Sequence, residues 1–261
     1  MKTPRFFSHP IAGKLLPEVL GEQYTQAAEP LWSAAGYKCQ ISQYDYHPIG
    51  GEGRCWLMLE PRDYLTGKTR AEGRPASNEE ISRAFRKAGI SSKTTQVIDP
   101  LLFWARHVDL AMKHRRGSLI FAPWITQGEL LILFRASTVA ATQEDFPGSQ
   151  SAQQILQEME LFGNGEIMKD VTATGDLNEH WSSEAWLDGV RKLPHKERRQ
   201  YLNHFGRHLR FWPDQTVFRP VIEHWKHISK SIIKNPQTET GNPWFNHYLK
   251  KYEQLIKTAQ G

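Results

Sequence analysis

The chain has 261 residues, 39% of them hydrophobic and 23% charged, with a formal net charge of +5 and a pI near 9.1. A chain of this length and apolar content can bury an ordinary core, which excludes disorder as its main state. The first 30 residues contain no apolar signal segment and no later run is long enough to span a bilayer, so we expect a soluble, cytoplasmic protein without direct membrane insertion.

The first third of the chain mixes short helices, turns and strands. Residues 1–30 are weakly patterned and predict an N-terminal arm, and Glu29–Gly36 predicts a helical turn that glycine ends. Residues 43–47 and 54–60 flank the glycines of 50–53, which predicts a hairpin between these two segments.

The middle of the chain carries helix signals. Residues 62–75 predict a loop, and the capping box at 77–80 predicts a short helix that Gly89 ends. Asp99 is a cap residue, and the apolar spacing after it predicts one helix that continues to Gly117.

The remainder reads as a strand followed by helices. Leu119–Phe121 predicts a strand, and the capping box Thr126–Glu129 predicts a helix through Ala141. Apolar spacing predicts further helices at residues 151–161, 183–191, 195–211, 220–233 and 243–257. The predicted fold class is therefore α+β.

The two cysteines, Cys39 and Cys55, are too few for a disulfide framework, and we expect reduced thiols in the role of small half-buried hydrophobes. In a zinc knuckle, two thiolates three positions apart in the chain bind one tetrahedrally coordinated zinc ion. Cys39 with Ser42 has this spacing, and Trp104 with His107 has that of a second ligand pair. The ligand chemistry is missing, because serine is a poor zinc ligand and tryptophan has no lone pair to offer.

The segments around these positions resemble, in the same order, those of the IcmJ (DotN) family of type IVB secretion systems. Tyr37–Gln40 looks like the entry to the family's first knuckle, and Phe103, Ala105 and Arg106 fall where its second cysteine pair is interleaved. Gly117–Leu130 resembles the strand and capped helix that follow in the family.

The resemblance covers about residues 30–230. Within this range, Ser151–Ile155 and Arg191–Pro194 are similar to the starts of two later helices in the family. Residues 67–93 are interpreted as an insertion. The resemblance implies an HNH-like (ββα) zinc fold that serves assembly and not cutting. It also implies a subunit of the coupling complex that holds the extended tail of the coupling ATPase and helps to organise adaptor proteins that recruit substrates.

Loss of two zinc ligands removes most of the roughly 10–16 kcal/mol that a structural zinc contributes. We therefore expect no zinc and no other cofactor, with the Trp104 ring filling the space. The vestigial ligand positions are Cys39, Ser42, Trp104 and His107. A residual site that uses Cys39, His107 and either a carboxylate or His47 is the alternative.

An HNH nuclease needs a histidine base on its first strand and a divalent metal ion. The sequence places that strand at Trp56–Leu59, which has no histidine, so we expect no catalytic residues and no enzymatic activity. His47, on the segment before it, is the alternative base, although a histidine beside Pro48 is more often a turn residue.

Two histidine pairs have helical spacing, His204 with His208 and His224 with His227. Neither has the carboxylate of an HExxH site, which favours solvated or core-edge histidines. The C-terminal helices also carry the basic residues Lys196, Arg198, Arg199, Arg207, Arg210, Arg219, Lys226 and Lys230, and the tryptophans Trp212, Trp225 and Trp244. A solvent-exposed charged face and core packing are the ordinary roles, and phosphate contacts and docking of a partner peptide are the alternatives.

These observations predict an N-terminal arm at 1–30, an HNH-like α+β module with a degenerate zinc knuckle at 31–145, with an insertion at 67–93, and a mostly helical region at 146–261. The expected function is a non-enzymatic adaptor of a type IVB-like secretion or conjugation system, recruited to the inner membrane through a partner. The alternative is a nucleic-acid-binding protein of a mobile element, and an HNH-type nuclease is the third hypothesis.

Overall fold

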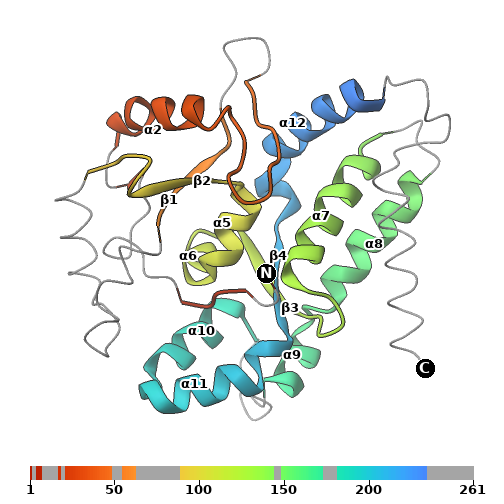
Figure 1. Cartoon of the computed structure of the whole chain (residues 1–261). Coiled ribbons are helices and arrows are strands. Elements are labelled where there is room, and N and C mark those ends of the chain that lie inside the picture. The colour runs from red at the N-terminus through yellow and green to blue at the C-terminus, as the bar shows by residue number, and fades with distance from the viewer. Residues whose placement is uncertain are drawn as a thin grey trace. The chain divides into compact units, whose positions relative to one another are not determined.

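The structure, a computed structural model, describes residues 1, 4–7, 17–18, 21–48, 55–62, 89–143, 148–172 and 181–233. Within them the fold is α+β, with a helical majority and two small antiparallel sheets (Figure 1). Contacts divide the chain into two compact units. The first unit is residues 7–106, and the second is residues 1–6 together with 107–261. The predicted parts 1–30, 31–145 and 146–261 stay predictions.

The first unit contains helix α2, Gln23–Ala34, whose end was predicted from Gly36. Gly36 and Tyr37 have positive φ angles of 59° and 52°. The Gly36 amide donates to the Ser33 carbonyl at 2.9 Å and the Tyr37 amide to the Trp32 carbonyl at 2.8 Å. This is the Schellman motif, in which a left-handed residue turns the chain back over the last helical carbonyls.

The sheet of the first unit pairs strand β1, Met58–Pro61, with strand β2, Thr95–Ile98, in antiparallel register. The predicted hairpin between 43–47 and 54–60 is therefore wrong where the structure describes it. Asp45 instead forms an isolated bridge with Lys38. Glycines allow a turn, but burial selected the partner, because Leu59 and Val97 face each other and are each 2% exposed.

Asp99 begins helix α5, Pro100–Arg106, as predicted. Its Oδ1 accepts from the Leu101 amide at 2.9 Å and from the Leu102 amide at 3.1 Å. The predicted continuous helix to Gly117 is wrong, because the backbone leaves the helical region at His107, with φ −135° and ψ 58°.

Helix α6, Val108–Lys113, begins the main part of the second unit. The amides of Val108 and Asp109, which an uninterrupted helix would use internally, donate at 3.2 Å to the carbonyls of Arg5 and Phe6. The N-terminal residues thus form the cap of α6, so this part of the predicted arm is packed structure.

Strand β3, Gly117–Phe121, follows and confirms the predicted strand. Its partner is strand β4, Leu209–Pro213, which pairs with it in antiparallel register. The predicted helix 195–211 is wrong at its end. Helix α11, His195–His204, gives way to a 3₁₀ turn, η3, Gly206–His208, and then to β4.

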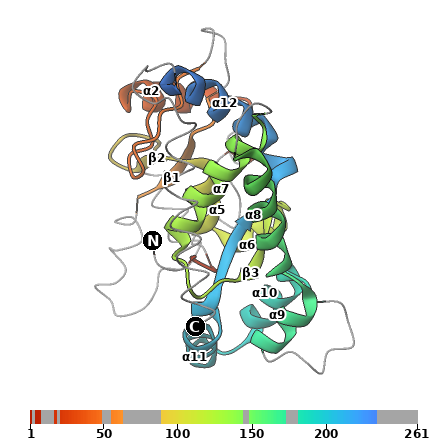
Figure 2. The same ribbon diagram turned by 90° about the vertical axis from the view of Figure 1, so that its right-hand side faces the viewer.

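Helix α7, Gln127–Ala141, is the centre of the second unit and has the predicted capping box between Thr126 and Glu129. It is buried on most sides because it packs against β4, against α8 (Ser149–Leu161) and against α12 (Gln215–Ile233), as Figures 1 and 2 show. Helix α12 begins before the predicted Pro220, which lies inside it.

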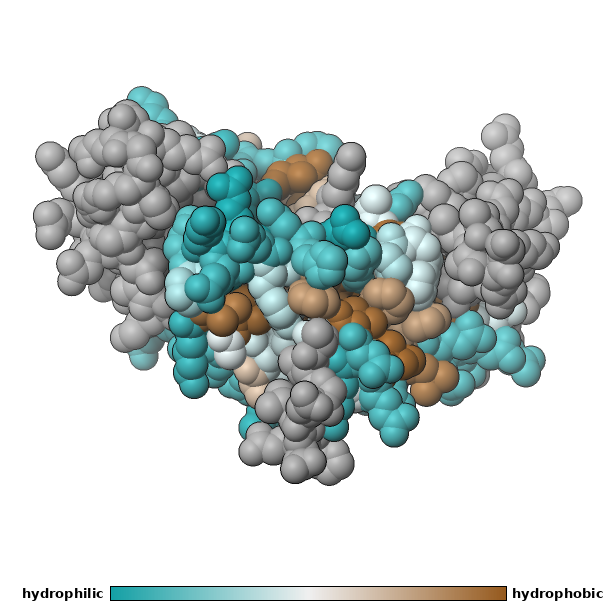
Figure 3. Space-filling view, turned by 90° about the horizontal axis from the view of Figure 1, so that it is seen from below, coloured by the Kyte–Doolittle hydropathy of each residue, from teal (hydrophilic) through white to brown (hydrophobic). Residues whose placement is uncertain are grey.

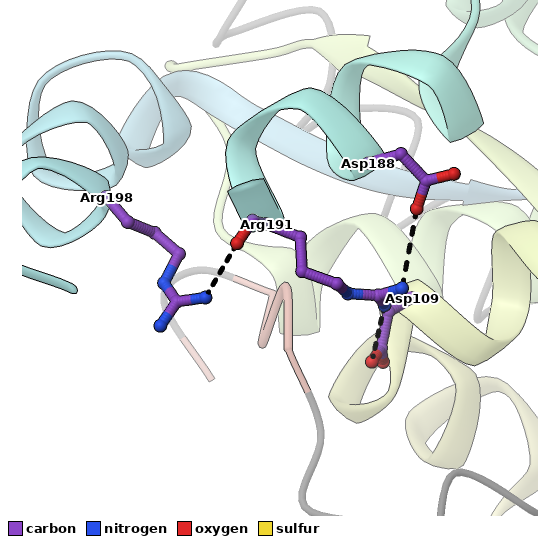
Figure 4. Close-up of polar contacts among 4 residues, drawn as sticks. All are labelled: Asp109, Asp188, Arg191 and Arg198. Atoms are coloured by element: carbon purple, nitrogen blue, oxygen red, sulfur yellow. Dashed lines mark hydrogen bonds and ion pairs between the residues drawn. The ribbon is translucent and has the colours of Figure 1, made fainter. Parts of the chain in front are cut away.

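Three further helices, α9 (Gly165–Val171), α10 (Ser183–Lys192) and α11, are gathered at one end of this unit (Figure 1). Arg191 of α10 joins them to α6. Its guanidinium lies 3.3 Å from the Asp109 carboxylate and 3.4 Å from that of Asp188, and Arg198 of α11 donates to its carbonyl at 3.2 Å (Figure 4). The bond from Arg198 gives the Arg191 carbonyl a donor, because the carbonyls of the last turn of α10 have no donor within the helix.

In the described part of the chain, no helix combines the length and the apolar character needed to cross a membrane. The predicted loop from residue 63 onward, the capping box at 77–80 and the helix at 243–257 lie outside the described residues.

Candidate functional site

The turn that begins at Cys39 is the candidate site in the first unit. The Schellman end of α2 delivers the chain to it, and the Cys39 side chain is fully buried. The Cys39 amide donates to the Tyr44 carbonyl at 3.0 Å, and the Cys39 carbonyl accepts from the Gln43 amide at 2.9 Å. These two bonds close a loop of a few residues around the thiol, which fixes the sulfur in place.

Two backbone amides point at that sulfur. The amide of Ile41 lies 3.4 Å from Sγ and the amide of Ser42 lies 3.2 Å from it. The Oγ of Ser42 is itself buried and has no hydrogen-bond partner among the described residues. The turn thus holds a sulfur and a hydroxyl at knuckle spacing, with the sulfur supported by backbone dipoles.

Gln40 fastens the turn to β2. Its amide donates to the Val97 carbonyl at 2.9 Å, and its side-chain Oε1 accepts from the Val97 amide at 3.1 Å. Arg62 also donates to this Oε1, at 3.4 Å. The sequence singles out Gln40 only as the end of the segment Tyr37–Gln40; its role could not be predicted, because that role depends on a strand that is far away along the chain.

Trp104 lies on α5 and is 5% exposed, and its ring meets Phe103 edge-on at a centroid distance of 5.2 Å. The helix that carries it is anchored twice in the first unit. The Tyr46 hydroxyl donates to the Asp99 cap, and Arg106 pairs with the buried Glu60 of β1 at 2.9 Å. Trp104 is therefore part of an apolar core, which is compatible with the expected space-filling role of its ring.

His107 is 6% exposed and is the residue that follows α5 and precedes α6 in the chain. Of the four vestigial positions, Cys39, Ser42 and Trp104 belong to the first unit and His107 begins the main segment of the second. Over the described residues, no group of three or more His, Cys, Asp or Glu side chains is arranged to hold a metal ion. The loss of zinc stays a prediction.

The second cysteine, Cys55, is half-buried. Burial raises the pKa of its thiol to about 12, against the partial opposing effect of a hydrogen bond from the Leu57 backbone. Such a thiol is protonated at neutral pH and has neither the charge of a zinc ligand nor the reactivity of a nucleophile.

His47, the alternative catalytic base, is exposed and engaged with its neighbour. Its Nδ1 lies 2.7 Å from the Asp45 carboxylate, and its ring packs against the Tyr37 ring at a centroid distance of 4.9 Å and a tilt of 46°. Burial raises the pKa of Asp45, but hydrogen bonds from the amide and ring of His47 outweigh it and lower the pKa overall. These contacts are those of a local turn.

The remaining predicted residues lie in the second unit. Trp212 and Trp225 are 2% and 5% exposed, so they are core residues and not docking residues. Their partner in the prediction, Trp244, lies outside the described residues. His204 and His208 lie on α11 and η3, and His224 and His227 on α12, the former buried and the latter exposed.

No protein-family model matches this chain, and a comparison with curated proteins found no match.

Proposed function

We propose that the chain is a non-enzymatic adaptor subunit of a type IVB-like secretion or conjugation coupling complex. In this proposal the first unit is a degenerate HNH-like zinc module, and the protein binds the extended tail of the coupling ATPase. It works in the cytoplasm and reaches the inner membrane through that partner.

The observation that carries the proposal is the turn at Cys39. Two amides, from Ile41 and Ser42, are directed at one buried sulfur, although no other thiol shares the turn. A small apolar residue does not require such an arrangement. A turn inherited from a zinc knuckle would retain it, because the same backbone once oriented a metal ligand.

The order of elements gives further support. An antiparallel pair, β1 and β2, is followed directly by α5, and Arg106 at the end of that helix reaches back to Glu60 on β1 at 2.9 Å. This is the sequence of elements expected for a ββα module. The Trp104 ring on α5 supplies packing where the resemblance expects a second ligand pair.

The absence of enzymatic activity is proposed from the residues of the expected nuclease strand. β1 consists of Met-Leu-Glu-Pro, and its glutamate is 2% exposed and paired with Arg106. Neither a free base nor a metal ligand is offered there for hydrolysis of a phosphodiester.

The decisive experiment is purification of the tagged protein from detergent-solubilised membranes of its own host. We expect the coupling ATPase of a type IV system to co-purify. Trp104→Asp, which introduces a charge into the core of the first unit, should abolish this capture, whereas Ser33→Asp on the exposed face of α2 should retain it. Absence of any coupling ATPase with the wild-type bait would contradict the proposal.

A plasmid assay tests the non-enzymatic part. Supercoiled DNA incubated with the protein and magnesium or manganese should stay intact. Metal-dependent nicking that disappears with His47→Ala would establish a nuclease instead, since His47 is the alternative base.

A further inference from the structure

Cationic groups gather where α11 ends and β4 begins. The buried Gly206 lies there and lets the Phe6 ring approach closely, since an added Cβ would lie 3.0 Å from that ring. The residues that follow bring Arg207, His208 and Arg210 together, with His204 of α11 close enough to influence the charge of His208. In the part of the chain that the structure describes, no carboxylate forms an ion pair with any of them.

Arg210 is the most unusual member, because it is 5% exposed. Within the described residues its guanidinium donates only to backbone carbonyls: Nε to Ile125 at 2.6 Å, and Nη1 to Arg207 at 2.8 Å and Leu209 at 2.7 Å. Arginine is rarely buried unless an acidic group pairs with it, because carbonyl dipoles leave its net charge uncompensated. Burial accordingly lowers its pKa.

The neighbouring side chains keep the positive potential at the surface. Arg207 is exposed, and its Nε donates to Nε2 of His208 at 2.9 Å, which requires a neutral imidazole that carries its proton on Nδ1. Burial, and then the charges of Arg207, Arg210 and His204, lower the pKa of His208. The cluster therefore disfavours another cation and favours an anion.

A row of aromatic rings continues from this cluster. The His208 and Phe121 rings lie 6.2 Å apart, Phe121 and Trp124 6.1 Å, and Trp124 and Phe162 4.7 Å, between centroids. All four residues are half-buried and none is fully enclosed in the core. Figure 3, the view from below, shows areas of apolar surface between hydrophilic ones on the described part of the chain.

The cluster and the row are fixed to one another by the backbone. The Ala122 amide donates to the His208 carbonyl at 3.0 Å, and Arg210 holds the Ile125 carbonyl, so both ends of the loop that carries Trp124 are tied to the basic segment. The Phe121 amide donates to the Phe162 carbonyl at 2.9 Å. A site held in this way loses little entropy when a ligand binds.

We propose that Arg207 and His208 bind the phosphate of a nucleotide unit whose base lies against the Phe121–Trp124 rings, and that the buried Arg210 adds positive charge behind them. This site goes beyond the proposed adaptor function and rests on different residues. Arginines match phosphate oxygens, and every base has a flat face that stacks on an aromatic ring. A carboxylate peptide would use the charges but not the ring row, which is why we favour a nucleotide. A free nucleotide and single-stranded nucleic acid share this chemistry.

Titration calorimetry at about 50 mM salt tests the proposal with three probes: inorganic phosphate, adenosine 5′-monophosphate and a ten-residue oligothymidylate. We expect the monophosphate or the oligonucleotide to bind at least about tenfold more tightly than phosphate, because stacking adds to the charge contacts. The tighter of the two distinguishes a nucleotide site from a nucleic-acid site. Binding of neither nucleotide probe would overturn the proposal.

Variants locate the site. Arg207→Glu and the milder Arg207→Gln should weaken binding about tenfold or more, as expected for one charge-assisted contact. Arg199→Glu, an equal charge reversal on the exposed face of α11, should change it less than about twofold. Equal losses in Arg199→Glu and Arg207→Glu would show general attraction to a basic surface and would overturn the site.

A second readout depends on His208 alone. A phosphate bound beside His208 should raise the pKa of its imidazole. An NMR titration of the ring signals, with and without adenosine monophosphate, measures this pKa. An unchanged pKa in the presence of saturating ligand would exclude His208 from the site. A negative result in these nucleotide-binding experiments would not change the expected capture of the coupling ATPase, so the two proposals can fail independently.

Discussion

Gln127 completes the open edge of β4 by bonding to Phe211. Its Nε2 donates to the Phe211 carbonyl at 2.9 Å, and its Oε1 accepts from the Phe211 amide at 2.8 Å. Both side chains are fully buried. A side-chain amide thus takes the place of a third strand, which leaves no unpaired backbone group at this residue.

Gln127→Leu should therefore destabilise the protein by about 2–4 kcal/mol, because the amide and carbonyl of Phe211 would be buried without partners. Gln154→Ala, an exposed glutamine on α8, is the control and should change stability by less than about 0.5 kcal/mol. The free energy of unfolding in urea measures both. A neutral Gln127→Leu would mean that water reaches the strand edge.

Two glycines should respond to alanine with opposite signs. A Cβ at Gly117 would lie 2.1 Å from the Trp212 carbonyl oxygen, so Gly117→Ala should cost about 3 kcal/mol or more. A Cβ at Gly189 in α10 would meet nothing within 4 Å, and Gly189→Ala should stabilise by about 0.5–1 kcal/mol. Thermal and urea unfolding of the two variants should show this difference, and shifts of the same sign would contradict it.

The pH dependence of stability should carry a contribution from His208. Burial and the nearby cations lower its pKa in the folded state below the ordinary value of 6.5. As the pH falls through about 6.5, His208 binds a proton in the unfolded chain but stays neutral in the folded chain. The free energy of unfolding therefore decreases as the pH is lowered. Between pH 7.5 and 5.5, His208→Gln should lose less stability than the wild type. An equal loss would argue against the lowered pKa.

The thiol of Cys55 should be nearly inert in the folded protein. Burial raises its pKa to about 12, so at pH 8 its thiolate fraction is about a thousandfold lower than that of a free cysteine. In Cys39→Ser, which leaves one thiol, iodoacetamide should react slowly with native protein and rapidly in guanidinium. Similar rates in the two conditions would place Cys55 in a more open environment.

The knuckle hypothesis predicts a gain of metal affinity. Ser42→Cys would place a second thiol on the turn that already holds Cys39, at the spacing of a zinc pair. Competition with a chromophoric chelator should show zinc binding at least about tenfold tighter than in the wild type. Ser33→Cys adds the same atom on the exposed face of α2 and should not bind more tightly. Equal zinc affinity in Ser42→Cys and Ser33→Cys would contradict the knuckle hypothesis.

The candidate site could be predicted only in part from the sequence. The spacing of Cys39 and Ser42 directed attention to the right turn, because a knuckle is a local feature. The role of Gln40 could not be predicted, since its two bonds to Val97 depend on a strand that comes much later in the chain. In the sequence Arg210 is one of many basic residues, and only its burial against backbone carbonyls distinguishes it.

The sequence alone determined the helix ends: Gly36 after α2, the Asp99 cap of α5, and the Thr126–Glu129 box of α7. Each depends on hydrogen bonds between residues a few positions apart, so the required groups stand next to one another in the printed chain. Only the tertiary structure decided that 209–213 is a strand and that 58–61 pairs with 95–98. Strand partners are selected by the apolar surface they bury together, and that surface exists only after distant segments have met.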